Sequence, residues 1–269
     1  SVVSREVMVS RPWSFGSGNP PKGTWRAPGG PSRADRSSSR FAEGRDRGKN
    51  RLMTHQPMLA GLQVVESSLL GPGLVGTFLA DLGADVVKVE SPTGDYIRQM
   101  TWPIVDGTSL MHLHTHRGKR SVAIDLKTPE GADLYRDLAR RADVVIEAMR
   151  PGTLARLGLG SDDLRADNER LVFCTVSGYG ATGPYRDLPS HGIAYDTWAG
   201  LIEPVVDDDG FTRIPPLPNI GINVGPMLAA LSVLAAVLDA RQTGRGRDIE
   251  VAQSDAAAYM DWYRIETYR

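Results

Sequence analysis

Short apolar runs alternate with helix-length segments along this chain of 269 residues, from Leu59 onward. Runs rich in Val, Ile and Phe suit a pleated surface and are expected to form strands. The expected strands are Leu62–Val65, Asp85–Glu90, Ser121–Leu126, Asp143–Glu147, Leu171–Val176 and Asp248–Ala252. The expected helices are Leu74–Leu82, Pro129–Arg141, Gly152–Leu157, Ser161–Asn168, Met227–Leu238 and one from Ser254. This alternation predicts an α/β fold, a parallel sheet with helices on both faces.

Two of the expected helices begin with residues that cap a helix. Thr128 precedes Pro129, which suits the first turn because it has no N–H to leave unpaired. Ser161 is followed by acidic residues that complement the start of the next helix. We therefore expect Thr128 and Ser161 to cap these two helices.

The stretch Leu171–Leu201 carries the clearest signal for a ligand site. Its apolar run stops at a turn rich in glycine, and a His, a Tyr and an Asp follow before the next helix. Open parallel sheets build their ligand sites where strands end in such turns, at the carboxyl edge. The stretch is therefore a site candidate on its pattern alone.

Charge divides the chain into two parts. Residues 1–52 hold 11 Lys/Arg and 4 Asp/Glu, whereas the remainder holds 20 and 28. Ser, Gly, Pro and Arg dominate residues 1–52 without a period, so a disordered N-terminal extension is expected there, and Met53 resembles a natural start. The folded part, residues 53–269, is acidic and lacks the basic face that a nucleic-acid partner would need.

The single cysteine, Cys174, lies inside an expected strand. One cysteine excludes an internal disulfide and fits a reducing, cytoplasmic compartment, and a buried, inert thiol is expected rather than a nucleophile. No apolar run reaches the length of a membrane span, because Ser232 interrupts the longest, Met227–Leu238. We therefore expect no membrane partner and interpret that run as a buried helix.

The segment GPGLVG, Gly71–Gly76, has the GxGxxG spacing of dinucleotide sites, with Glu90 where a ribose-binding acid would lie. Glu66–Leu70 separates it from the preceding strand, and Pro72 removes a donor from the turn. Close packing of a helix on the sheet is the alternative role for these glycines, and we favour it.

The segment HLHTH, His112–His116, would place three imidazoles on one face if it were extended. Three histidines and a water can hold catalytic zinc. No cysteine accompanies them, and RGKR follows directly and repels cations. We therefore expect no metal, and favour a polar loop that enters the next strand.

Basic residues lie at both ends of the expected strand Ser121–Leu126. The segment RGKRS, Arg117–Ser121, ends at the first residue of this strand, and Lys127 directly follows its last residue. Such residues either form a solvated loop or pair with the phosphates of an anionic cofactor. Further along, Asp207–Asp209 before Gly210 predicts a hairpin turn.

The ordered stretches FLADLGADVVKVESPTGD, RGKRSVAIDLKTPEG, ADVVIEAMRPGTLARLG, VSGYGATGPYRDLPSH and LAAVLDARQTGRGRDIEVAQSDA resemble the class III CoA-transferase family, which also contains α-methylacyl-CoA racemases. The resemblance covers Leu59–Ala257 and implies a Rossmann-like large domain. It also implies an acyl-CoA and a carboxylic acid as small-molecule partners, with coenzyme A itself as the group transferred. An interlocked homodimer is implied too, and so is a small domain that would lie largely beyond the end of this chain.

The resemblance also implies roles for particular residues. The nucleotide end of CoA would lie along Ile124 to Lys127, with Lys127 and Arg156 offering positive charge to its phosphates. Ser177 and Gly178 would approach the pantetheine and thioester, and His191 occupies the place of the racemases' proton-exchanging histidine. The residues implied to bind coenzyme A are Ile124, Lys127, Ala148, Met149, Arg150, Arg156, Ser177 and Gly178.

One position departs from the family pattern. The family's attacking carboxylate falls at Ile222, and an isoleucine is neither a nucleophile nor a base. Asp196 is the nearest substitute, whereas Asp255 is expected to cap a helix. Three functions remain open on the sequence: transfer of CoA between carboxylic acids, α-proton transfer with His191 as base, and a non-catalytic CoA-binding subunit.

Overall fold

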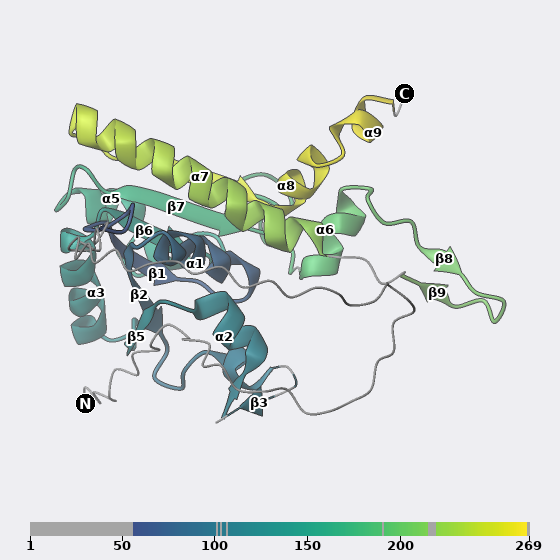
Figure 1. Ribbon diagram of the computed structural model, residues 1–269, viewed down its shortest axis with the longest axis horizontal. Coiled ribbons are helices and arrows are strands. Elements are labelled where there is room, and N and C mark those ends of the chain that lie inside the picture. Colours follow the sequence, from purple (N-terminus) through teal and green to yellow (C-terminus); the bar gives the residue numbers. More distant parts are fainter. Residues whose placement is uncertain are drawn as a thin grey trace, which may run out of the picture. The chain divides into compact units, whose positions relative to one another are not determined.

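The computed structural model describes residues 56–267 except 101, 103, 106, 190 and 215–218. The expected extension over residues 1–52 lies outside the described residues. The part of the chain that the structure describes is built around one large sheet with helices packed against it (Figure 1).

Six parallel strands form that sheet, in the order β10-β7-β6-β1-β2-β5. They are β1 (Gln63–Ser67), β2 (Asp85–Glu90), β5 (Arg120–Ala123), β6 (Val144–Glu147), β7 (Val172–Ser177) and β10 (Asp248–Ala252). The chain builds outward from β1 to β2 and β5, then returns to the other side of β1 with β6, β7 and β10. This is the strand order of a Rossmann fold, so the expected α/β class is confirmed.

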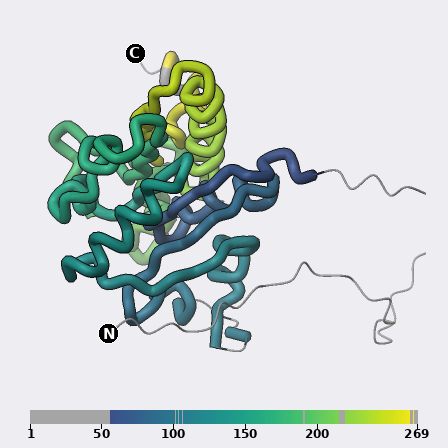
Figure 2. The backbone as a smooth tube through the Cα atoms, turned by 90° about the vertical axis from the view of Figure 1, so that its left-hand side faces the viewer, coloured from purple at the N-terminus to yellow at the C-terminus, as the bar shows by residue number. Residues whose placement is uncertain are grey.

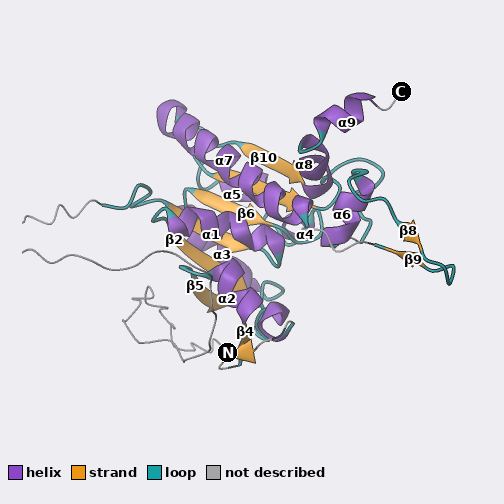
Figure 3. Cartoon of the chain, turned by 45° about the vertical axis from the view of Figure 1, so that its right-hand side comes forward, coloured by secondary structure: helices purple, strands orange, loops and turns teal. Residues whose placement is uncertain are grey.

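Helices cover both faces because neighbouring residues of each strand point to opposite sides. On one face, Val64 and its neighbours pack under α1 (Leu74–Asp81) and α7 (Ile220–Thr243). On the other, Val65 lies in a second core under α3 (Pro129–Arg141), and this core also takes in residues from α4 (Thr153–Arg156) and α5 (Ser161–Arg165). Figures 1 and 3 show these helices about the sheet.

The remaining elements are short and lie mostly beyond the strand ends. They are η1 (Gly71–Gly73), η2 (Tyr96–Gln99), β3 (Ile104–Val105), β4 (Thr108–Ser109), α2 (Leu110–His116), α6 (Gly192–Trp198), β8 (Val205–Val206), β9 (Thr212–Arg213), α8 (Gln253–Tyr259) and α9 (Trp262–Thr267). Strands β8 and β9 pair antiparallel about the turn Asp207–Gly210, so the predicted hairpin is confirmed.

Several sequence expectations hold to the residue. Strands β2 and β10 and helix α3 have the expected bounds, and the Thr128 side chain accepts from the Gly131 N–H at the start of α3. Cys174 is fully buried, and burial raises the pKa of its thiol to about 12, as expected for an inert residue. Ser161 does not cap α5, however. Gly160 is the N-cap, and its N–H donates to the carboxylate of Asp163.

The expectation for HLHTH was wrong, because this segment is the helix α2 and not a loop. The Ser109 side chain accepts from the His112 N–H and so caps the helix start. His112 and His116 are four residues apart and share the buried face, whereas His114 is exposed. The three imidazoles therefore do not share one face.

Helix α7, the yellow-green coil in Figure 2, is longer than the expected Met227–Leu238. It is the one described helix that is long and apolar enough to cross a membrane by length and composition, contrary to the expectation that no run is long enough. A core helix meets the same criteria, and 44% of its apolar window is buried in this structure. Its buried side packs on the sheet, while Met227, Leu231 and Leu238 are exposed.

The glycines of GPGLVG allow close packing, as we favoured. A Cβ added to Gly76 would lie 3.1 Å from Val86 Cγ1 in β2 and 1.8 Å from Glu66 Oε2 in β1. The helix α1 therefore lies as close to the sheet as its backbone permits.

We predict that Gly76→Ala destabilises the protein by about 1–3 kcal/mol, because the added methyl group has no space beside the buried Glu66 carboxylate. Urea unfolding followed by circular dichroism would measure the shift in midpoint. An unchanged or raised midpoint would show that α1 does not pack as described.

Candidate functional site

The order of the strands reverses at β1, which lies between β2 and β6. Chain segments leave the carboxyl ends of β1 and β6 in opposite directions, so their loops diverge and leave room for a ligand. Ser67 ends β1 and Glu147 ends β6, and the two residues pair across the sheet. This edge of the sheet is therefore the expected place for a binding site.

The sequence-predicted binding residues follow the carboxyl ends of three strands. Ile124 and Lys127 come after β5, Ala148, Met149 and Arg150 come after β6, Ser177 ends β7 and Gly178 follows it. Arg156 closes the short helix α4 beyond β6. Strands β5 and β7 are four places apart in the sheet, or roughly 19 Å at the usual strand spacing. Residues spread over that distance suit an elongated ligand.

The three cations among the predicted CoA-binding residues are exposed. Lys127 and Arg150 are both exposed, and Arg156 is exposed while donating to Thr153 Oγ1 at 2.9 Å. Ile124 is buried, and its N–H donates to the Glu90 carbonyl at 2.9 Å. This edge of the sheet therefore carries three cationic groups on long side chains, which can pair with anions.

The first turn of α7 meets η1 and the start of α6 at Ile222, the position where the resemblance places the family's attacking carboxylate. A Cβ added to Gly71 would lie 2.0 Å from Ile222 Cγ1, and one added to Gly192 would lie 3.4 Å from Ile222 Cδ1. His191 directly precedes Gly192, caps α6 and is exposed. Ile222 therefore lies between the β1 loop and the residue next to His191.

Asp196, the predicted substitute acid, holds the start of α7. Its Oδ2 accepts from the Ile220 N–H at 2.8 Å and its Oδ1 from the Gly221 N–H at 2.7 Å. The side chain is buried, and a carboxylate at a helix start is stabilised by the unpaired amides there. Both oxygens are thus engaged, which leaves Asp196 poorly placed to attack a thioester in this conformation.

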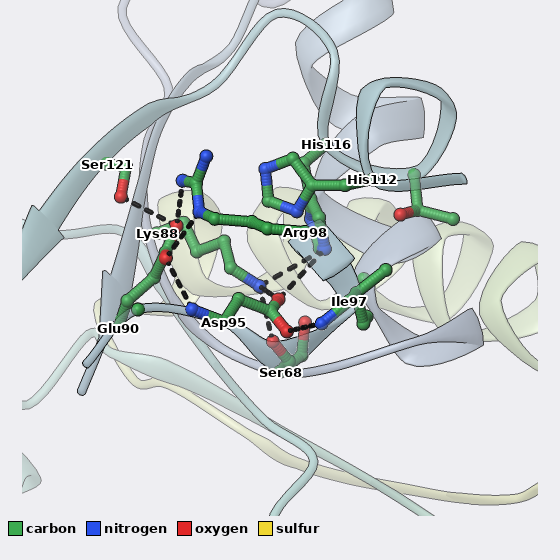
Figure 4. Close-up of polar contacts among 12 residues, drawn as sticks. Ser68, Lys88, Glu90, Asp95, Ile97, Arg98, His112, His116 and Ser121 are labelled. Atoms are coloured by element: carbon green, nitrogen blue, oxygen red, sulfur yellow. Dashed lines mark hydrogen bonds and ion pairs between the residues drawn. The ribbon is translucent and has the colours of Figure 1, made fainter. Parts of the chain in front are cut away.

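A buried ionic network beside the β1 loop was missed by the sequence analysis. Lys88 Nζ lies 2.5 Å from Asp95 Oδ2, and Lys119 Nζ lies 2.7 Å from Glu66 Oε2 (Figure 4 shows the Lys88 side). The four side chains are at most 2% exposed. A signal was available in the sequence, since Lys88 is a charged residue inside an otherwise apolar strand run.

His116 links the two ion pairs. Its Nδ1 is 3.2 Å from Lys119 Nζ, and its Nε2 is 3.2 Å from Lys88 Nζ and 3.4 Å from Asp95 Oδ2. An ammonium group can only donate, and each ring nitrogen faces one, so a neutral imidazole, with its single acceptor nitrogen, accepts a hydrogen bond from one of the two lysines. Burial lowers the pKa of His116, which agrees with this neutral form.

Asp95, His112 and His116 offer ligand atoms within 4.8 Å of one another, a spacing that a metal ion could bridge. The Lys88 ammonium, however, touches both Asp95 and His116 and already supplies the positive charge there. The positive charges of the two lysines neutralise the negative charges of the two carboxylates without a bound metal ion. The donor set therefore fits an internal ion-pair network and does not fit a metal site.

The basic segment RGKRS is used within the fold and does not form a phosphate site. Arg117 pairs with Asp81 and Arg120 pairs with Asp85, the latter at 2.6 Å. Ser121 donates to Glu90 at 2.7 Å, and Lys119 is buried against Glu66. Of the basic residues weighed for phosphates around strand β5, Lys127 remains as an exposed cation at the carboxyl edge.

A family model described as CoA-transferase family III matches residues 59–268. The chain therefore belongs to CoA-transferase family III, as the resemblance implied. Succinate–glutarate CoA-transferase of Agrobacterium fabrum is 38% identical over 209 residues, covering 74% of this chain and 52% of the relative. Human alpha-methylacyl-CoA racemase is 33% identical over 213 residues, covering 78% and 52%.

Solved structures agree with the fold. Rv3272 from Mycobacterium tuberculosis superposes with a TM-score of 0.71 at 34% identity, covering 78% of this chain and 59% of that one. A CAIB/BAIF family protein from Brucella suis has a TM-score of 0.71 at 33% identity, covering 80% and 58%. The chain thus spans about half the length of the curated relatives that it matches.

The buried His112 makes a prediction about pH. Burial, with the nearby His116, lowers its pKa from 6.5 to about 4, and its Nδ1 has no hydrogen-bond partner among the described residues. The unfolded chain takes up the proton below 6.5 and the folded protein does not, so stability falls as pH drops from 6.5 to about 4. We expect this residue to contribute up to about 3 kcal/mol of that loss.

Urea midpoints measured from pH 7 to pH 4 would test this. The variant His112→Gln should flatten the profile, whereas His114→Gln, which changes an exposed histidine of the same helix, should leave it unchanged. Equal profiles for the wild type and His112→Gln would contradict the burial described for His112.

Proposed function

We propose that this chain binds an acyl-CoA along the carboxyl edge of its sheet, and that the whole protein moves CoA between carboxylic acids. The family match carries this proposal. Relatives at 38%, 36% and 40% identity are named succinate–glutarate, succinyl-CoA–L-malate and succinyl-CoA–D-citramalate CoA-transferases. The net reaction exchanges one acyl-CoA and one free acid for another pair, so no redox partner is needed.

The geometry of the edge supports an elongated thioester. Lys127, Arg150 and Arg156 are exposed cations on the β5 and β6 loops, suited to the phosphates of the nucleotide end. Ser177 ends β7 and Gly178 follows it, farther along the same edge of the sheet. We propose that the ligand runs from the cations toward the β7 turn and ends near His191 and Ile222.

We predict that Lys127→Ala raises the Kd for CoA about threefold to tenfold, because it removes one phosphate-pairing charge. Isothermal titration calorimetry would measure the change, which should shrink as salt is raised. The matched control is Arg241→Ala, which makes the same charge change near the carboxyl end of α7, far from the proposed ligand. Equal effects from both variants would remove Lys127 from the site.

The usual transferase reaction needs a carboxylate that attacks the thioester, releases CoA thiolate and forms a mixed anhydride. The thiolate then attacks the enzyme's acyl carbon, frees the first acid and leaves an enzyme thioester. Ile222 supplies no such oxygen. We therefore propose that this chain binds the thioester without carrying out this covalent step by itself.

We predict that Ile222→Asp creates the missing nucleophile. With an acyl-CoA and a free acid present, the variant should form an adduct that hydroxylamine releases, visible by mass spectrometry, and the unaltered chain should not. The control is Asn223→Asp, which adds the same charge on the exposed side of the same helical turn. An adduct on the unaltered chain, or on the control alone, would contradict the role given to position 222.

A second candidate function is proton transfer at the α-carbon of an acyl-CoA. His191 is exposed, and a Cβ added to its neighbour Gly192 would lie 3.4 Å from Ile222 Cδ1, which places this residue close to the proposed acyl end. An imidazole can act as acid or base near neutral pH, and human alpha-methylacyl-CoA racemase is among the relatives. On this reading, His191 would be the base.

This alternative predicts deuterium incorporation at the α-carbon in heavy water. The rate should fall at least about a hundredfold in His191→Ala, since a general base contributes on the order of 10²–10⁴ in rate. Incorporation that survives the substitution would exclude His191 as the base.

A third possibility is a CoA-binding subunit that works with a catalytic partner. Two relatives are named as subunits, of succinyl-CoA–L-malate and of succinyl-CoA:(R)-benzylsuccinate CoA-transferase. Ile222 fits this role, because a partner would supply the carboxylate. Turnover by a purified homodimer, the assembly that we propose from the family, would rule it out.

A further inference from the structure

The loop Ser68–Gly73, which leads from β1 into α1, has a strained backbone at the reversal point of the sheet. Leu70 has φ 55° and ψ −139°, and it is the only non-glycine residue with positive φ among those described. Such a conformation is energetically unfavourable for a residue with a side chain and persists only where neighbouring groups impose it. Interactions with neighbouring groups must therefore stabilise the conformation of this loop.

Two buried lysines donate hydrogen bonds to the two ends of the loop. Lys88 Nζ donates to the Ser68 carbonyl at 2.8 Å, and Lys119 Nζ donates to the Gly73 carbonyl. Each ammonium is also bound to a buried carboxylate, Asp95 or Glu66, so neither is free to turn away. His116 lies between the two lysines, with one ring nitrogen 3.2 Å from each ammonium nitrogen.

Buried ion pairs of this kind are expensive to build. The cost of removing such charges from water often exceeds their attraction, and apolar residues of similar size frequently give equal or greater stability. Two adjacent pairs under one loop are therefore poorly explained by stability alone. What they provide here is a fixed position for two backbone carbonyls.

The Ser68–Gly73 loop contacts the proposed acyl end of the site. A Cβ added to Gly71 would lie 2.7 Å from the Ile222 carbonyl oxygen, and one added to Gly73 would lie 2.4 Å from His116 Cε1. A rigid path of contacts thus runs from the ion-pair network through the loop to the first turn of α7. Shifting the loop would move the surface beside position 222.

We propose that Lys88 and Lys119 are positioning residues that hold the Ser68–Gly73 loop against Ile222, so that the loop can receive the acyl group of a CoA thioester. This inference rests on the proposed function. The lysines act through the loop and do not touch the ligand. The effect of losing them should therefore fall on acyl-CoA and spare the nucleotide end.

The test uses Lys119→Met and a second variant, Lys119→Met with Glu66→Gln, which removes the carboxylate's charge as well and so avoids a buried unpaired charge. The control is Arg120→Met, which breaks the exposed pair with Asp85 at the adjacent position. Hydrogen exchange would report on the Gly73 amide, which donates to the Leu70 carbonyl at 3.0 Å. Calorimetry would compare succinyl-CoA with free CoA.

Loss of a hydrogen bond from a charged group to a buried carbonyl should speed exchange of the Gly73 amide at least about tenfold in the double variant. Affinity for succinyl-CoA should fall by about the same factor, and affinity for CoA should stay within about twofold. The control should match the wild type in both measurements.

Exchange that is unchanged in both Lys119 variants would overturn the inference. Equal weakening of both ligands would also overturn it, since that is what general destabilisation produces. A wild type that binds neither ligand would disprove the proposed function, while the exchange rates would still decide whether the lysines hold the loop.

Discussion

Strand β1 is the constraint on which the rest of the structure depends. It is paired in parallel on both sides, with β2 and with β6, and its residues contribute to the cores on both faces. Because the connections after β1 and β6 lead away in opposite directions, the loops at these two strand ends cannot close over each other. The fold therefore leaves an open edge, where we propose that Ser68–Gly73, Ala148–Arg150 and the start of α7 face a ligand.

Mutual neutralisation of charge explains how charged side chains can be buried beside that edge. Glu66 and Asp95 are buried with Lys119 and Lys88, and neutral His116 bridges them, so the network carries no net charge. Hydrogen bonds to Asp95 from Ile97 and the contacts with Lys88 and His116 hold the pKa of that carboxyl well below its usual value, although burial alone would raise it. The network can thus remain ionised while it fixes backbone carbonyls.

The sequence predicted the sheet well because short runs rich in valine and isoleucine mark strands, and Asp85–Glu90 and Asp248–Ala252 have the expected bounds. The assignment of Ile222 to the place of the attacking carboxylate came from the family resemblance and stays a prediction. Prediction from the sequence failed at His112–His116, where a serine cap and burial against Asp95 produce a helix. The Lys88 and Lys119 pairings could not be predicted, because their partners are brought together only by the fold.

Binding of coenzyme A along the carboxyl edge is the central claim, and hydrogen exchange with saturating CoA tests it most directly. The account predicts slower exchange in residues 124–127, 148–150 and 177–178, which follow or end three strands, and no change at the amino edge around residues 141–143 and 244–247. Protection at the amino edge, or no protection anywhere along the chain, would contradict it.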